Sequence, residues 1–166
     1  VTISEDGPPC SCGNYGCLEA MAVGRAIAQR AQMAVQAGQR TILADKNHSE
    51  TLTALDVAEA AKGGDVISQQ LLGDAGRHIG SALASLINLL NPGLVIVGGG
   101  VTGAGDFLIE PIREAVAARS LRPALYATRI LVAGLGRRST ALGALSLALA
   151  RVFRNYVEAG QKRPSR

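Results

Sequence analysis

The 166-residue sequence has no tryptophan, few aromatic residues of any kind, three cysteines and two histidines. Three cysteines are too few, and odd in number, for the disulfide framework of a small secreted domain. The 20 glycines follow no three-residue period, which excludes a collagen-like chain. With 48% hydrophobic and 18% charged residues the chain is not intrinsically disordered. Its length allows a core that buries roughly two-thirds of the unfolded surface.

A targeting segment is also lacking, as is a starting methionine. Residues 1–6 have neither the basic stretch nor the apolar run of a secretory signal, so a cytoplasmic protein is expected. Residues 79–105 carry no charge and are long enough for a membrane helix. Asn88, the Asn91-Pro92-Gly93 turn and the Gly98-Gly99-Gly100 run interrupt this stretch. It is therefore interpreted as helix, turn and buried strand, with no membrane contact expected.

The net charge of +4 is concentrated at one end. Residues 151–166 hold five basic side chains against one acidic, so residues 1–150 are neutral in sum. A basic stretch after the last apolar residue is more often a solvated terminus than a binding arm. The sequence predicts a globular lobe over residues 1–156 and a disordered basic tail over 157–166. Because the lobe has little net charge, its electrostatics do not favour DNA binding.

Hydrophobic periodicity predicts a helix-rich first half. An alanine-rich helix is expected from Leu18 to about Ala37, followed by an irregular segment over 38–50. A capping box at Thr53 predicts a short helix to about Lys62. The strongest helix begins at Asp65 and ends before Pro92. Its apolar residues recur at the spacing of one helix face, namely Ile67, Leu71, Ala75, Ile79, Leu83, Leu86 and Leu90.

The second half reads as an α/β unit. Residues 94–97 are a short apolar run that predicts a buried parallel strand. Asp106 is expected to cap a helix that reaches about Arg119, and a strand is expected over 129–133. Ser139 or Thr140 is expected to cap a last helix that runs to about Tyr156. Pro111 is expected to be tolerated only near the start of its helix. Two parallel strands do not make a stable sheet alone, so further strands are expected to come from elsewhere.

The cysteines form the most specific motif. Cys10, Cys12 and Cys17 lie within eight residues, in a segment stiffened by prolines and glycines. Thiolates are soft ligands suited to Zn²⁺, which takes four ligands in a tetrahedron. A disulfide is disfavoured because two cysteines separated by one residue close a strained ring. The motif predicts a structural zinc loop over residues 7–19.

Three thiols leave one coordination position open. The two histidines, His48 and His78, lie far from the loop in sequence and read as surface or helix-face residues. The fourth ligand is therefore expected before Val1. Taken alone, the carboxylate of Glu19 either interacts favourably with the helix dipole, which is the preferred interpretation, or faces a ligand. Gly98, Gly99 and Gly100 form either a tight turn or a contact to a phosphate or adenine.

The segment from Gly7 to Ala20, GPPCSCGNYGCLEA, closely resembles the signature of the ROK family (repressors, open reading frames and sugar kinases). A second run, LLNPGLVIVGGGV over residues 89–101, is similar to that family's other hallmark. The resemblance implies the C-terminal lobe of a two-lobed, actin-like (ribonuclease H-like) ATPase fold. It further implies that Cys10, Cys12 and Cys17 hold Zn²⁺ with an upstream histidine of a Gly-His pair, that Glu19 binds sugar hydroxyls, and that Gly98, Gly99 and Gly100 line the nucleotide site of the kinases.

The resemblance leaves two parent proteins open. No counterpart of the family's Asp-x-Gly-x-Thr phosphate loop or of its catalytic aspartate is present, so no catalytic residue is assigned and this chain alone is not expected to phosphorylate a sugar. The segment Gly136-Arg137-Arg138 before the last helix favours a sugar-responsive repressor, which would bind DNA through a domain absent from this chain. The intact glycine run favours an ATP- and Mg²⁺-dependent, glucokinase-like sugar kinase. Either parent is expected to form a homo-oligomer.

Overall fold

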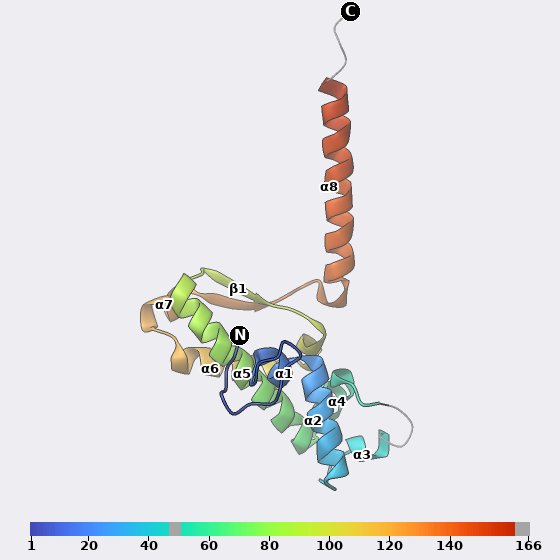
Figure 1. Ribbon diagram of the computed structural model, residues 1–166, viewed down its shortest axis with the longest axis vertical. Helices are drawn as coiled ribbons and strands as arrows, with labels where there is room; N and C mark the ends of the chain where they lie inside the picture. Colours follow the sequence, from blue (N-terminus) through green and yellow to red (C-terminus); the bar gives the residue numbers. More distant parts are fainter. Residues whose placement is uncertain (47–50, 162–166) are drawn as a thin grey trace, which may run out of the picture. The chain divides into compact units, whose positions relative to one another are not determined.

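The computed structural model describes residues 1–46 and 51–161. These residues belong to two units, 1–133 and 134–166. The first unit holds helices α1 to α7 and both strands, and the second holds α8 (Figure 1). None of the helices in the described ranges combines the length and hydropathy that a membrane-spanning segment requires. The uncharged stretch 79–105 is instead the expected succession of helix, turn and strand.

Helix α5 (Val66–Leu90) is the central helix of the first unit. The Asp65 carboxylate caps it by accepting a hydrogen bond from the backbone N–H of Ser68 at 2.8 Å. Asn91 ends it in a left-handed conformation directly before Pro92. Both predicted ends are thereby confirmed. Around α5 lie the helices that contact it (Figure 1), which are α1 (Leu18–Ala22), α2 (Gly24–Gln36), α4 (Ala54–Lys62), α6 (Asp106–Arg119) and α7 (Arg122–Ala127).

The buried face of α5 differs from its predicted apolar stripe. Leu86 and Leu90 are exposed, whereas Ile87 is fully buried. Gly76 and Gly80 are buried as well, because the backbone of α6 passes directly over them. A Cβ atom on Gly80 would lie 2.6 Å from the carbonyl oxygen of Ile112. The hydropathy pattern cannot predict a buried helix face made of glycines. Glycine allows two helices to pack closely but adds little apolar area.

The expected helix over residues 18–37 is two helices. Val23 has an extended conformation, with ψ of 163°, and separates α1 from α2. The segment expected to be irregular contains a short helix, α3 (Leu43–Lys46). At α4 the predicted capping box is confirmed: Thr53 Oγ1 accepts from the backbone N–H of Asp56, and the Asp56 carboxylate accepts from the backbone N–H of Thr53.

Strands β1 (Leu94–Val97) and β2 (Arg129–Val132) pair in parallel, with Leu94 opposite Arg129. The predicted parallel pairing is confirmed, whereas the prediction that β1 is fully buried is wrong. Val95 and Val97 pack against the core, whereas Leu94 and Ile96 are exposed. Among the described residues the sheet has only these two strands, so helices cover one face and the other lies open.

The connection from β1 to β2 contains η1 (Gly100–Ala104), α6 and α7. Gly105, and not Asp106, is the residue before the first turn of α6. Pro111 lies in the second turn of that helix, further in than expected. Helix α7 was not predicted. The hydroxyl of Thr128 donates to the carbonyl oxygen of Pro92 at 2.7 Å and thereby joins the start of β2 to the turn before β1.

The second unit begins with a short 3₁₀ turn, η2 (Gly136–Arg138), followed by α8 (Ser139–Gln161). Ser139 is itself the first helical residue, so the helix begins one residue before the earliest start that the predicted caps allow. The helix continues to Gln161, beyond the predicted end at about Tyr156, so its last turn enters the segment predicted to be a disordered tail. Residues 162–166 lie outside the described residues. Leu142, Leu145 and Leu149 form an apolar row at helical spacing, and the described part of this unit has no second helix or strand for them to pack on.

Candidate metal centre and adjoining pocket

Residues 7–17, here called the cysteine loop, are folded by backbone hydrogen bonds. The N–H of Cys10 donates to the carbonyl of Asn14 at 2.8 Å, and the N–H of Gly13 donates to the carbonyl of Cys10 at 3.0 Å. The N–H of Gly16 donates to the carbonyl of Pro8 at 2.8 Å, which closes the loop. The segment before the loop is attached to it, because the N–H of Ile3 donates to the carbonyl of Gly16 at 2.9 Å.

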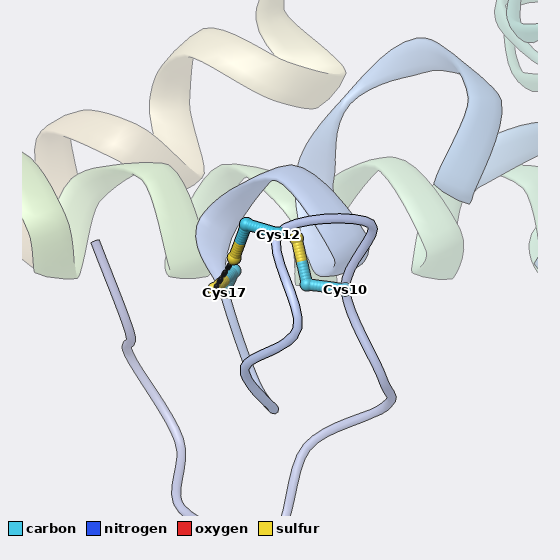
Figure 2. Close-up of side chains that lie close together, drawn as sticks. All are labelled: Cys10, Cys12 and Cys17. Atoms are coloured by element: carbon cyan, nitrogen blue, oxygen red, sulfur yellow. Dashed lines mark hydrogen bonds between the residues drawn. The ribbon is translucent and has the colours of Figure 1, made fainter.

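This folding gathers the three thiols beside the start of α1 (Figure 2). Their sulfur atoms all lie within 4.8 Å of one another, and the sulfurs of Cys12 and Cys17 are 3.6 Å apart. Tetrahedral zinc with Zn–S bonds of about 2.3 Å would place its sulfur ligands about 3.8 Å apart. Cys10, Cys12 and Cys17 can therefore bind a metal ion, and their spacing fits Zn²⁺.

Two of the thiols have shifted pKa values. The backbone N–H of Asn14, followed by Cys10 and Cys17, stabilises the thiolate of exposed Cys12 and lowers its pKa. The hydrogen bond with Cys12, followed by burial, raises the pKa of Cys17. Because metals bind thiolates, Cys12 supplies one more readily than Cys17 does, and a bound cation would favour deprotonation of Cys17.

Within residues 1–46 and 51–161 the structure brings no histidine to the thiols. Among the described residues the three cysteines are the whole group of potential metal ligands in this region. His78 lies half-buried on α5, where burial first, and then the charge of Arg30, lowers its pKa. It is a helix-face residue, as expected. His48 lies outside the described residues, so its expected surface position stays a prediction.

Glu19 lies in the first turn of α1, two residues after Cys17, and is exposed. It lines a pocket of about 900 Å³ that is also lined by residues of the cysteine loop, namely Pro8, Pro9, Cys10 and Ser11. Within the described part of the chain no hydrogen bond or ion pair engages the Glu19 carboxylate. It is therefore available to accept hydrogen bonds from a ligand, in a pocket shaped by the cysteine loop.

The remaining walls of the pocket come from α2 and from residues 51–54. Gln29, Gln32 and Gln36 line it from one face of α2. Sequence reasoning did not single out these amides. Their spacing of three and four residues, opposite the buried Ile27, Ala31 and Ala34, is the signal that could have found them.

The glycine run lies elsewhere in the first unit. Gly98, Gly99 and Gly100 connect β1 to η1, and none of them lines the pocket that contains Glu19. Gly98 packs closely on Ala133 beside the end of β2, where an added Cβ would be 3.2 Å from that side chain. No atom of the described residues lies within 4 Å of the position that a Cβ atom would take on Gly99 or Gly100. The turn thus leaves its backbone accessible at the carboxyl end of the parallel strands, where α/β folds commonly bind ligands.

The sequence profile of the ROK family matches residues 1–151. The glucokinase of Halalkalibacterium halodurans is 36% identical over 144 residues, which are 86% of this chain and 44% of that protein. The xylose repressor of Caldicellulosiruptor bescii is 29% identical over 149 residues, which are 90% of this chain and 37% of the repressor.

Solved structures give the same result for the fold. A ROK family transcriptional regulator homologous to the Escherichia coli MLC protein superposes with a TM-score of 0.73 at 32% identity, over 80% of this chain and 33% of the regulator. A ROK family glucokinase from Streptomyces griseus, in complex with glucose and AMPPNP, superposes with a TM-score of 0.71 at 30% identity, over 89% of this chain and 49% of the kinase. The chain thus spans less than half the length of each of these proteins.

Proposed function

The chain belongs to the ROK family, and we propose that it is the sugar-binding lobe of a sugar-responsive transcriptional regulator of that family. In this proposal the chain is the C-terminal lobe of a longer, two-lobed cytoplasmic protein that forms homo-oligomers. DNA is bound by a separate domain. The observation that carries the sugar-binding role is the unpaired carboxylate of Glu19 in the pocket beside the cysteine loop.

The chemistry of Glu19 suits a sugar ligand. An ionised carboxylate accepts hydrogen bonds from two hydroxyl groups, and hydrogen bonds to a charged group contribute about 1.5–3 kcal/mol each. Glu19 is held in place because α1 begins directly after Cys17, which is buried. A sugar bound by Glu19 and by residues of the other lobe would favour the closed arrangement of the two lobes, and this shift would alter DNA binding.

Zinc has a structural role in the proposal. Cys10, Cys12 and Cys17 would hold the ion together with a ligand that precedes Val1, and the ion would cross-link the cysteine loop. Pro8, Cys10 and Ser11 belong to that loop and also line the pocket. Zinc would thus stabilise one wall of the sugar site without taking part in a reaction.

The segment before α8 supports a regulator over a kinase. Gly136-Arg137-Arg138 forms the turn η2, whereas the resemblance to the family implies an acidic turn with small residues at this place in a kinase. The alternative, a glucokinase-like kinase that uses ATP and Mg²⁺, is supported by Gly98, Gly99 and Gly100, whose accessible backbone could approach a nucleotide. The gene sequence upstream of Val1 distinguishes the parents, because a helix-turn-helix would identify a regulator and an Asp-x-Gly-x-Thr motif a kinase.

Replacing Glu19 tests the sugar-binding role. Glu19→Gln retains the shape and one acceptor but removes the charge, so we expect sugar affinity in the full-length protein to fall roughly ten-fold, with unchanged thermal stability. Glu114→Gln is the matched control, because Glu114 is an exposed residue of α6 that does not line the pocket. Isothermal titration calorimetry with glucose and xylose measures both variants. Equal affinities of Glu19→Gln and wild type would refute the role of Glu19.

A further inference from the structure

We propose that the pocket beside Glu19 binds a sugar of two linked rings, a disaccharide or a glycoside, and not only a monosaccharide. One ring would lie at Glu19, and the second along α2. This inference rests on the proposed function, because Glu19 is taken as the contact of the first ring. It adds a second subsite, here called the α2 subsite, which is lined by Gln29, Gln32, Gln36 and Thr51.

The size of the pocket is the first argument. Its volume of about 900 Å³ lies near the top of the range of roughly 300–1,000 Å³ that is typical of pockets for drug-sized ligands. A single sugar ring leaves much of this volume unfilled. The lining residues of α2 extend from Gly24 to Gln36, a distance of about 18 Å along the helix at 1.5 Å per residue. This length exceeds one pyranose ring and accommodates two.

The pocket extends along α2, between this helix and the segment that precedes α4. The start of α4 lies against the start of α2, where an added Cβ on Gly24 would be 3.4 Å from the Cβ of Ala54. Residues 51–54 therefore form the second side of a groove whose first side is α2, and Glu19 on α1 contributes to the same pocket. A ligand that begins at Glu19 has room to continue along α2.

The chemistry of the α2 subsite is the second argument. Gln29, Gln32 and Gln36 recur at three and four residues, so their amides follow one face of the helix. Each amide both donates and accepts, as sugar hydroxyls do. Exposed apolar surface lies among them, since Val23 is 41% and Met33 is 64% exposed. Amides alternating with apolar surface match the hydroxyl groups and C–H faces of a sugar ring.

The charge of the lining agrees with a neutral second ring. Within residues 1–46 and 51–161, Glu19 and Arg25 are the two charged residues that line the pocket, and they carry opposite charges. The other described side chains that line the groove beyond Gly24 are amides, hydroxyls and apolar groups. A ring recognised there exchanges hydrogen bonds with water for hydrogen bonds with neutral amides, which contributes a modest affinity for each amide.

The experiment compares each monosaccharide with its β-1,4-linked disaccharide by titration calorimetry on the full-length protein. Glucose is paired with cellobiose and xylose with xylobiose. We expect the disaccharide of the preferred sugar to bind at least ten-fold more tightly than the monosaccharide. Gln29→Leu and Gln36→Leu should each weaken disaccharide binding roughly two- to ten-fold and leave monosaccharide binding unchanged. Gln70→Leu is the control, because Gln70 is exposed on α5 and does not line the pocket.

The outcomes separate the subsite from the proposed function. Monosaccharide binding that depends on Glu19, with no gain for the disaccharide, would overturn the α2 subsite and leave the proposed function intact. Disaccharide binding that is tighter but insensitive to Gln29→Leu and Gln36→Leu would also overturn it. Binding of neither sugar by a folded protein would overturn both proposals. Tighter disaccharide binding that both variants reduce would establish the subsite.

Discussion

The substitution Gly16→Ala tests whether close backbone packing holds the cysteine loop in its metal-binding form. Gly16 has φ of +59° and Gly13 has φ of +89°, so alanine is conformationally strained at both positions. The surroundings of the two residues differ. A Cβ on Gly16 would lie 1.6 Å from the carbonyl oxygen of Ser4, whereas a Cβ on Gly13 would have no neighbour within 4 Å in the part of the chain that the structure describes. Gly13→Ala is thus a matched control for the conformational strain.

The expected magnitudes follow from these contacts. The left-handed conformation costs alanine about 1–2 kcal/mol at either position. At Gly16 the chain around Ser4 must also move by more than an ångström, which breaks the hydrogen bonds that the backbone N–H groups of Ile3 and Ser4 donate to the carbonyl of Gly16. Each broken hydrogen bond costs about 1 kcal/mol. We expect Gly16→Ala to destabilise the loop by about 3–4 kcal/mol in total and Gly13→Ala by about 1–2 kcal/mol.

Zinc affinity is the assay for this difference. The extra cost of about 2 kcal/mol at Gly16 corresponds to roughly 30-fold weaker zinc binding than in Gly13→Ala. Competition with a chromogenic chelator, together with metal analysis by mass spectrometry, measures affinity and stoichiometry for wild type and both variants. Equal zinc affinities of Gly13→Ala and Gly16→Ala would refute the argument from close packing. A wild-type protein that takes up no zinc would refute the metal site itself.

Two further predictions concern the scaffold around the site. Burial raises the pKa of Asp65, but hydrogen bonds from Ser68, Ile42 and Thr41 outweigh that effect and leave the pKa below its usual value. The stability that ionised Asp65 contributes is therefore complete above about pH 4 and is lost as the pH falls below it. Asp65→Asn should lower the free energy of unfolding, measured with denaturant, by about 1–2 kcal/mol at pH 7 and by less at pH 3. The same loss at both pH values would contradict the stabilising role of the ionised Asp65 carboxylate. Gly80→Ala gains about 1 kcal/mol of helix propensity, but its Cβ would be 2.6 Å from both Ala115 and Ile112, so we expect a net loss of about 1–2 kcal/mol and a Tm lower by roughly 2–8 °C. The control Gly73→Ala meets only the flexible Arg77 side chain at 3.3 Å and should be neutral or stabilising; a comparable loss in this variant would show that close packing on α6 is not the cause.

Local features of the chain were predictable because their causes are local. The capping box of Thr53 and Asp56, the Asp65 cap and the stop at Pro92 each depend on residues within one helical turn. The metal-binding potential of the cysteines is also local, since loop closure alone brings three thiols within eight residues together. Short apolar runs separated by a helix were sufficient to predict the parallel pairing of β1 and β2.

Burial and the composition of the pocket depended on contacts between distant segments. Gly76 and Gly80 belong to the buried face of α5 because α6 packs on them, and no periodicity within α5 specifies where a neighbouring helix lies. Leu94 and Ile96 are exposed because the described residues supply helices to only one face of the sheet.

The sequence by itself determined the family, the cysteine motif and most of the helices, since these depend on residue type and short spacing. Only the tertiary structure decided that Glu19 shares a pocket with the amides of α2 and with residues 51–54. The break at Val23 and the packing of Gly24 on Ala54 create that pocket. Side chains far apart in sequence form a site only when chain packing brings them together, and that packing is a property of the whole unit.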